Sequence, residues 1–185
     1  HFLAGWLPWQ AGQLSIGGRD QLGLNPENKA LTFLPAQPGL YGHWTVRENI
    51  AFPARSLGVD DQSGALIEEF QMESLAKRKA RDLSLGERQR VAWARVLNRP
   101  AQWILADEAM NHLDGPQRHC VWQALGRRLP GGLLLVTHQL QQDLPWLDSL
   151  STMERGELHP VNLAELAQNP RSEWLAQQLS PENVW

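Results

Sequence analysis

Residues 103–108 read Trp103-Ile104-Leu105-Ala106-Asp107-Glu108, an apolar run that ends in two adjacent carboxylates. A short apolar run of this kind is typical of a strand in a parallel sheet. Transfer of a phosphoryl group to water needs a carboxylate near Mg²⁺ and a second group that orients or deprotonates the attacking water. We expect Asp107 to meet the first need and Glu108 the second, although an Asp-Glu pair after a strand can also begin a solvated loop.

Two further apolar runs have the same form, at residues 31–34 and 133–137. Gln37 comes shortly after the first run, and His138 comes directly after the second. Because helical stretches separate the runs, the pattern predicts an α/β fold in which a largely parallel sheet is covered by helices on both faces. Ligands of such sheets bind at the carboxyl ends of the strands, so the three polar endings predict one site.

Helical patterns fill the chain between these runs. Residues 60–99 contain a helical region whose later part carries apolar side chains at helical spacing, and Asn98-Arg99-Pro100 would end it. Another helix is predicted over about residues 116–129, with Asp114 as its N-cap. The last predicted elements are a hairpin turn over residues 154–157 and a helical tail over residues 162–179.

Residues 83–87, Leu83-Ser84-Leu85-Gly86-Glu87, open the last helix of that region. Ser84 with Glu87 three residues later is a capping box, which by itself stabilises the start of a helix. The same arrangement is also a ready anion site, because a helix N-terminus attracts negative charge and a glycine allows close approach. The two interpretations can hold together.

The composition excludes several classes of function. The 185 residues, with 42% hydrophobic content, suit one domain with a buried core. A net charge of -3 provides no basic field to hold nucleic acid, so we expect no nucleic-acid partner. The single cysteine, Cys120, cannot form an internal disulfide, which is typical of a reducing compartment. No apolar run approaches the ~18–20 residues that span a bilayer, so we expect the chain itself to be soluble.

These segments, in this order, resemble the motifs of the ABC-type ATPases. Residues 83–87 resemble the ABC signature Leu-Ser-Gly-Gly-Gln, with Leu85 and Glu87 as departures from it. Residues 103–114 resemble the Walker B strand and the D-loop that follows it, with Ala109-Met110 in place of the usual Pro-Thr.

Two more motifs complete the resemblance. Gln37 lies in a segment similar to the Q-loop, which residues 44–50 continue, and His138 resembles the switch histidine. The resemblance covers nearly the whole chain. It implies a P-loop NTPase-like parallel sheet core with a small α-helical subdomain inserted at about residues 55–99. Residues 1–185 would then form part of one nucleotide-binding domain.

The resemblance implies ATP and Mg²⁺ as cofactors, and it implies a role for each motif residue. Gln37 would contact Mg²⁺ or its water and report bound nucleotide to a membrane domain. Asp107 would hold Mg²⁺ through its water shell, Glu108 would be the general base, and His138 would hydrogen-bond the γ-phosphate. The residues that would face a second nucleotide-binding domain and its ATP, in a head-to-tail dimer, are Ser84, Leu85, Gly86, Glu87 and Asp114.

The resemblance also implies parts that precede these residues. The phosphate-binding loop and its lysine are expected just before His1, because Ala4-Gly5 resembles the end of the helix that follows that loop. Residues 1–185 alone are therefore expected to be almost inert with ATP. The whole protein is expected at the cytoplasmic face of a membrane, where it would drive transport through a membrane-spanning subunit or domain.

Two alternatives stay open at this point. One is a non-transport ABC ATPase of the translation-associated or chaperone-like kind, which Asn111-His112-Leu113-Asp114 suggests. The other is a degenerate domain that binds nucleotide without turnover, against which Glu108 and His138 argue. Residues 163–176 loosely resemble the ends of exporter-type domains, which favours export over import.

Overall fold

The computed structural model describes residues 12–163, which belong to two compact units. The first unit contains residues 12–137 of the described chain and the second contains residues 138–163. The predicted helical tail lies almost wholly outside the described residues, so it stays a prediction. None of the helices within residues 12–163 is both long enough and apolar enough to cross a lipid bilayer.

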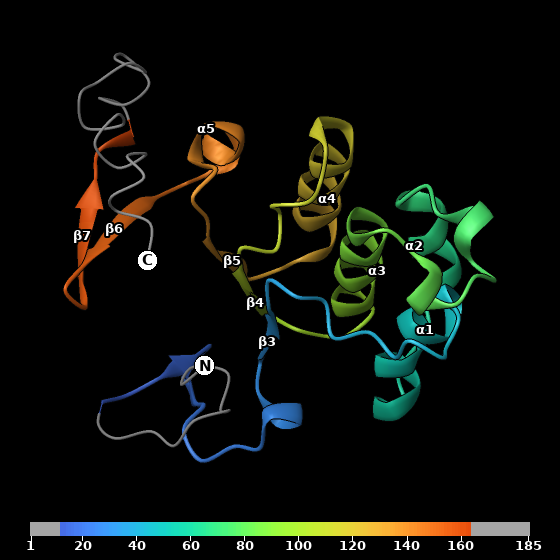
Figure 1. Cartoon of the computed structure of the whole chain (residues 1–185). Coiled ribbons are helices and arrows are strands. Elements are labelled where there is room, and N and C mark those ends of the chain that lie inside the picture. Colours follow the sequence, from blue (N-terminus) through green and yellow to red (C-terminus); the bar gives the residue numbers. More distant parts are fainter. Residues whose placement is uncertain (1–11, 164–185) are drawn as a thin grey trace. The chain divides into compact units, whose positions relative to one another are not determined.

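The core of the first unit is a three-stranded parallel sheet (Figure 1). Its strands are, in spatial order, β3 (Leu31–Leu34), β4 (Trp103–Asp107) and β5 (Gly132–Val136). The register pairs Leu34 with Ala106, and Ala106 with Leu135. The predicted parallel sheet is therefore confirmed. Its third strand begins and ends one residue earlier than predicted, because Gly132 pairs with Trp103.

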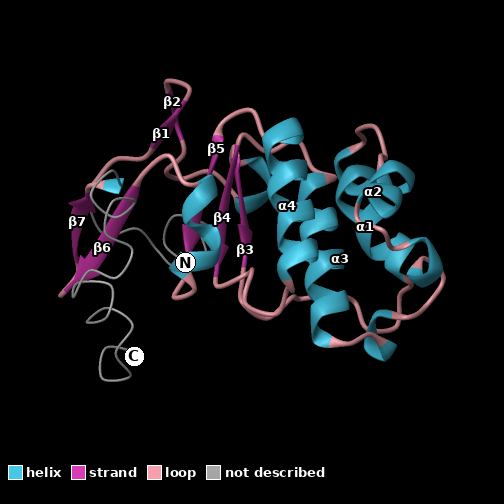
Figure 2. Ribbon diagram, turned by 90° about the horizontal axis from the view of Figure 1, so that it is seen from above, coloured by secondary structure: helices cyan, strands magenta, loops and turns pink. Residues whose placement is uncertain are grey.

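The two faces of this sheet have different neighbours. Ile104 and Ala106 point to one face and are buried there. The helices α3 (Leu85–Leu97) and α4 (Gly115–Arg128) lie together on one side of the sheet (Figure 2). Leu134 and Val136 point to the other face and are 50% and 55% exposed. The sequence predicted helices on both faces. Within residues 12–137 that prediction holds for one face only, because both long helices next to the sheet pack on the same side of it.

The helical region begins earlier than the sequence predicted. α1 (Val46–Leu57) packs against both α2 (Ser63–Glu69) and α3, whereas the predicted region began near residue 55 or 60. A capping box starts α1: Thr45 accepts a hydrogen bond from the N–H of Glu48, and the Glu48 carboxylate accepts one from the N–H of Thr45. Pro53 lies inside α1, and a proline is unfavourable in a helix interior, so the sequence of residues 46–57 is not typical of a helix.

A charged cluster around Glu69 links α4 to α2. Arg127 Nη2 lies 2.6 Å from Glu69 Oε1, and Arg128 Nε lies 2.7 Å from Glu69 Oε2. Arg128 also donates to Gln62 Oε1, and the thiol of Cys120 donates to the backbone carbonyl of Glu69. Burial raises the pKa of Glu69, but the hydrogen bonds and charges of the two arginines outweigh it and hold this pKa below its ordinary value.

We expect Glu69→Gln to lower the free energy of unfolding of the full-length protein by about 1–2 kcal/mol at neutral pH, because both arginines lose a charged acceptor. The folded pKa of Glu69 is lowered, so its stabilisation is complete above the unfolded pKa of about 4.5 and is lost as the pH falls through the folded pKa. The difference between wild type and variant should therefore shrink in acid. Urea unfolding across this pH range measures it, with the exposed neighbour Glu68→Gln as the control. Equal effects of the two substitutions would contradict the expectation.

The remaining strands form two antiparallel hairpins, one in each unit. In the second unit, Glu154 pairs with Glu157 around Arg155 and Gly156, which confirms the predicted turn. Both turn residues have a positive φ, 49° at Arg155 and 86° at Gly156. The elements are β1 (Ser15–Ile16) and β2 (Arg19–Asp20) in the first unit, and α5 (Leu140–Asp143), β6 (Leu150–Glu154) and β7 (Glu157–Val161) in the second.

Candidate functional site

The carboxyl ends of the strands lie at one edge of the sheet. β4 ends at Asp107, and Leu34, the last residue of β3, pairs with the preceding residue Ala106. Gln37 follows β3 by three residues and is exposed. β5 ends at Val136, which pairs with Asp107. The chain therefore leaves β3, β4 and β5 at the same edge. Asp107 is the last residue of β4 at this edge, and Gln37 lies in the segment that leaves β3.

Glu108 has a strained backbone. Its φ of 50° lies in the left-handed region, which costs a residue other than glycine about 1–2 kcal/mol. The backbone N–H of Glu108 donates to the Val136 carbonyl at 2.9 Å, and Glu108 Oε2 accepts a hydrogen bond from Asn111 Nδ2 at 3.0 Å. Strain of this kind persists only where the surroundings fix the residue, and it is concentrated at functional sites. The geometry therefore supports Glu108 as a functional residue over a solvated loop residue.

Buried side chains from two helices hold the loop after β4. Gln89 Nε2 donates to the Ala109 carbonyl at 2.7 Å, and Trp93 Nε1 donates to the same oxygen at 2.9 Å. Arg118 of α4, also buried, donates to the Met110 carbonyl at 2.8 Å. The sequence did not single out these three side chains. The sequence feature that could have indicated two of them is the spacing of Gln89 and Trp93, which are four residues apart and so lie on one face of α3.

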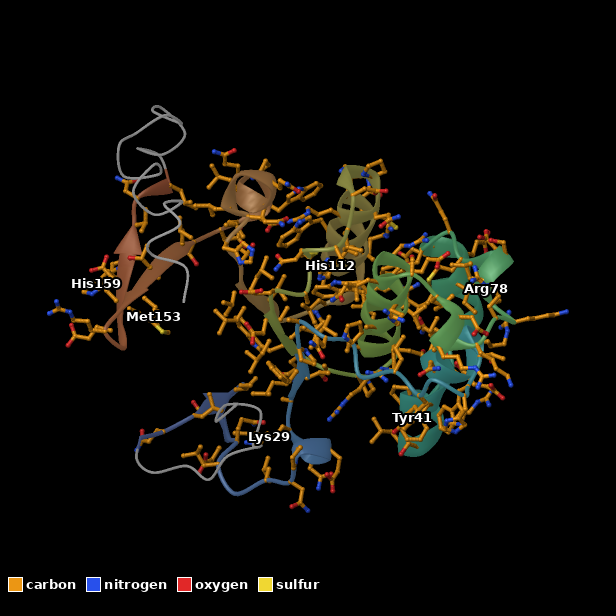
Figure 3. All side chains as sticks on the ribbon, viewed as in Figure 1. Lys29, Tyr41, Arg78, His112, Met153 and His159 are labelled. Atoms are coloured by element: carbon orange, nitrogen blue, oxygen red, sulfur yellow. The ribbon has the colours of Figure 1, made fainter. Side chains whose placement is uncertain are left out.

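α3 starts with the capping box that the sequence predicted. Glu87 donates its N–H to Ser84 Oγ at 3.3 Å, and Glu87 Oε2 accepts the N–H of Ser84 at 2.7 Å. The hydrogen bond from the Ser84 N–H lowers the pKa of Glu87, and the guanidinium of Arg78, 3.6 Å away, lowers it further despite partial burial (Figure 3). Ser84 and the neighbouring Leu85 are exposed, so the box stabilises the helix and still leaves its first residues accessible.

Gly86 is required for packing within the chain. A Cβ at this position would lie 2.8 Å from the backbone oxygen of His112, which is closer than real Cβ atoms come to other atoms. His112 belongs to the loop between β4 and α4 (Figure 3). The space that a side chain at position 86 would fill is therefore occupied by the loop between β4 and α4. This packing brings the signature-like segment into contact with the segment that follows Glu108.

Two other predicted site residues, Asp114 and His138, are exposed. Asp114 is the N-cap of α4, as predicted, and its Oδ1 accepts a hydrogen bond from the N–H of Gln117 at 2.8 Å. His138 follows the end of β5 by two residues and is the first residue of the second unit. The roles of both residues in nucleotide chemistry stay predictions.

The described residues offer few metal ligands. Nowhere in residues 12–163 do three or more His, Cys, Asp or Glu side chains gather as a metal site would require. Asp107 offers one carboxylate, and Gln37 offers one amide oxygen from the same edge of the sheet. Mg²⁺ bound with a nucleotide needs no more, because it keeps several waters and takes its other ligands from the phosphates. This donor set therefore fits Mg²⁺ with a nucleotide and does not fit a structural zinc site.

Comparison with known proteins gives one consistent family. The model of the ABC transporter family matches residues 1–111 of this chain. The molybdate/tungstate import ATP-binding protein WtpC of Pyrococcus horikoshii is 31% identical over 98% of this chain and 55% of its own length. The spermidine/putrescine import ATP-binding protein PotA of Frankia alni is 29% identical over 98% of this chain and 41% of its own length. The chain thus spans about half the length of the curated relatives it matches.

Solved structures give the same result for the fold. One of them, described as the ATP-binding subunit of an ABC transporter, superposes on 96% of this chain with a TM-score of 0.80. The superposition covers 80% of that subunit at 22% sequence identity. The predicted fold class, a P-loop NTPase-like parallel sheet with helices, is therefore confirmed.

Proposed function

The chain belongs to the ABC transporter family, and on that basis we propose that this protein binds and hydrolyses ATP to drive transport of a substrate across a membrane. The observation that carries the proposal is the pair Asp107 and Glu108, with Glu108 in a strained conformation directly after the central strand of the sheet. Release of phosphate from ATP by the full-length protein, compared between wild type and Glu108→Gln, tests the proposal.

Each of the predicted site residues would have one task in the proposed reaction. Glu108 accepts a proton from the attacking water, while Gln37 and His138 orient that water and the γ-phosphate. Asp107 would hold Mg²⁺, which would supply positive charge next to the phosphates when bound. The two carboxylates are suited to different tasks because Asp107 ends the strand, whereas Glu108 lies in the left-handed turn that follows it.

A second nucleotide-binding domain would complete the site. The residues that would contact the γ-phosphate of ATP bound by that second domain are Ser84, Leu85, Gly86 and Glu87. Asp114 would contact the second domain itself. The exposure of Ser84, Leu85 and Asp114 supports a head-to-tail dimer, because these groups are accessible without unfolding the starts of α3 and α4. Capping uses only one carboxylate oxygen of Asp114, so the other oxygen can serve a partner.

An aromatic cluster formed by Tyr41, Trp44 and Phe52 is the surface that we propose for a membrane partner. Its ring centroids lie 4.2 to 5.3 Å apart. Tyr41 is 40% exposed and Phe52 is 37% exposed, and Tyr41 lies beside α1 (Figure 3). Trp and Tyr are enriched among the few residues that supply most of the binding energy at protein interfaces. The cluster begins four residues after Gln37, so a partner that docked here would contact the segment joining the nucleotide site to α1.

Replacing Trp44 by alanine in the complete transport complex is expected to weaken assembly with the membrane subunit about tenfold, because the cluster loses its largest ring. Stimulation of ATP hydrolysis by that subunit should fall in parallel. Both are measured against wild type and against Leu24→Ala, which truncates an exposed apolar side chain elsewhere. Unchanged assembly and equal stimulation would rule Trp44 out as an anchor. Failure to find any membrane partner would favour a non-transport ATPase.

We propose that residues 1–185 form part of one nucleotide-binding domain at the cytoplasmic face of a membrane. Its helical subdomain, predicted at residues 55–99, would also include α1.

We also propose import over export. The relatives are named for import, whereas the tail that suggested export lies outside the described residues. The same names do not favour the translation-associated alternative. The strained backbone of Glu108 and its hydrogen bond with Asn111 argue against a degenerate domain, because a domain without hydrolysis would not need a positioned base.

A further inference from the structure

We propose that Trp93 is a positioning residue for Glu108. Its indole N–H, together with Gln89, fixes the carbonyl of Ala109, and so fixes the residue on which the orientation of Glu108 depends. This inference rests on the proposed function, in which Glu108 is the general base.

Two donors on α3 converge on one acceptor. Trp93 and Gln89 are both fully buried, and their N–H groups lie 2.9 and 2.7 Å from the same Ala109 oxygen. A carbonyl oxygen has two lone pairs, so these two donors satisfy it completely. Rotation of the Ala109 carbonyl would leave two buried donors without an acceptor, which is strongly unfavourable. The conformation of Ala109 is therefore fixed by α3.

This constraint acts in a tight turn that Glu108 begins. The Glu108 carbonyl accepts a hydrogen bond from the N–H of Asn111 at 3.2 Å, so Ala109 occupies the second position of a four-residue turn. Proline is favoured at that position because its ring fixes φ near about −65°. Alanine leaves φ free, and a free neighbour would let Glu108 relax from its φ of 50°. The buried donors of α3 supply the constraint that alanine lacks.

Core packing alone does not account for Trp93. An aliphatic or phenyl side chain would fill a buried position without needing an acceptor, whereas a buried indole N–H requires one. The acceptor of this N–H is the backbone carbonyl of Ala109, the residue next to Glu108 in the loop that packs against α3. The polar atom of Trp93 is thus aimed at the proposed catalytic loop.

The test is Trp93→Phe in the full-length protein, which keeps an aromatic ring and removes the N–H. We expect kcat for ATP hydrolysis to fall about five- to tenfold while KM for ATP changes less than about twofold, because binding groups are untouched and the base is misplaced. Ala109→Pro, added to Trp93→Phe, should restore at least about half of the lost rate by fixing φ directly. Trp122→Phe, the same change at another buried tryptophan, is the matched control and should keep the wild-type kcat.

Thermal unfolding of each variant shows whether it is folded, and so distinguishes a misplaced Glu108 from a misfolded protein. If Trp93→Phe does not fold, benzothienylalanine at position 93 makes the same test, since sulfur replaces the N–H and the bicyclic shape is kept. A kcat within about twofold of wild type for the folded variant would overturn the proposal, and so would a loss that Ala109→Pro does not reverse. Glu108→Gln in the same assay keeps the two ideas apart: normal turnover by that variant would remove the proposed function, whatever Trp93 does.

Discussion

Full-length protein with Glu108→Gln is expected to hydrolyse ATP at least ~10²-fold more slowly than wild type while it still binds ATP, because a neutral amide keeps the shape of the carboxylate and cannot accept a proton. The amide can also keep a hydrogen bond with Asn111, so the geometry of the loop should survive. Dimers with ATP trapped between them should accumulate, since closure proceeds and hydrolysis does not. Phosphate release, ATP binding by calorimetry and the mass in solution with ATP measure the three effects.

The matched control for this prediction is Glu73→Gln, which makes the same chemical change at an exposed glutamate of the helical region. It should hydrolyse ATP like wild type. A normal rate for Glu108→Gln would remove Glu108 from the role of base and would return the strained turn to a purely structural explanation. Loss of ATP binding in Glu108→Gln would instead show that the carboxylate is needed to assemble the site.

The features that the sequence predicted well are local. Ser84 with Glu87 three residues later is a capping box, and Asp114 is a favoured N-cap residue before α4; the structure contains both caps. The strand ending at Asp107 is a short apolar run with carboxylates at its end, which periodicity alone can indicate. The family motifs then made the assignment of the fold secure.

The features that the sequence could not predict depend on contacts between distant segments. Gly86 packs against the backbone of His112, and no pattern within either segment shows that they meet. The convergence of Gln89 and Trp93 on Ala109 likewise joins residues 16 to 20 positions apart. Tertiary packing determines these contacts, so they cannot be predicted from local propensity.

The contact between Gly86 and His112 leads to the second large effect. Gly86→Ala is expected to destabilise the full-length protein by about 1–3 kcal/mol, because the new methyl group would stand 2.8 Å from a backbone oxygen. Neither side can move away easily. The start of α3 is held by the Ser84–Glu87 capping box, and the loop is held by Arg118 through the Met110 carbonyl.

Gly126→Ala in α4 is the matched control for this substitution, since Gly126 is also helical and nothing lies within 4 Å of a Cβ built there. Alanine should stabilise at that position by about 0.4–1 kcal/mol, because it restricts the unfolded chain and favours the helix. Both substitutions share these gains, so the difference between their free energies of unfolding isolates the contact with His112. Urea unfolding of the two variants and wild type provides that difference. If Gly86→Ala proves as stable as Gly126→Ala, the loop after Glu108 yields to α3, and the tight packing between the two is not what fixes the loop.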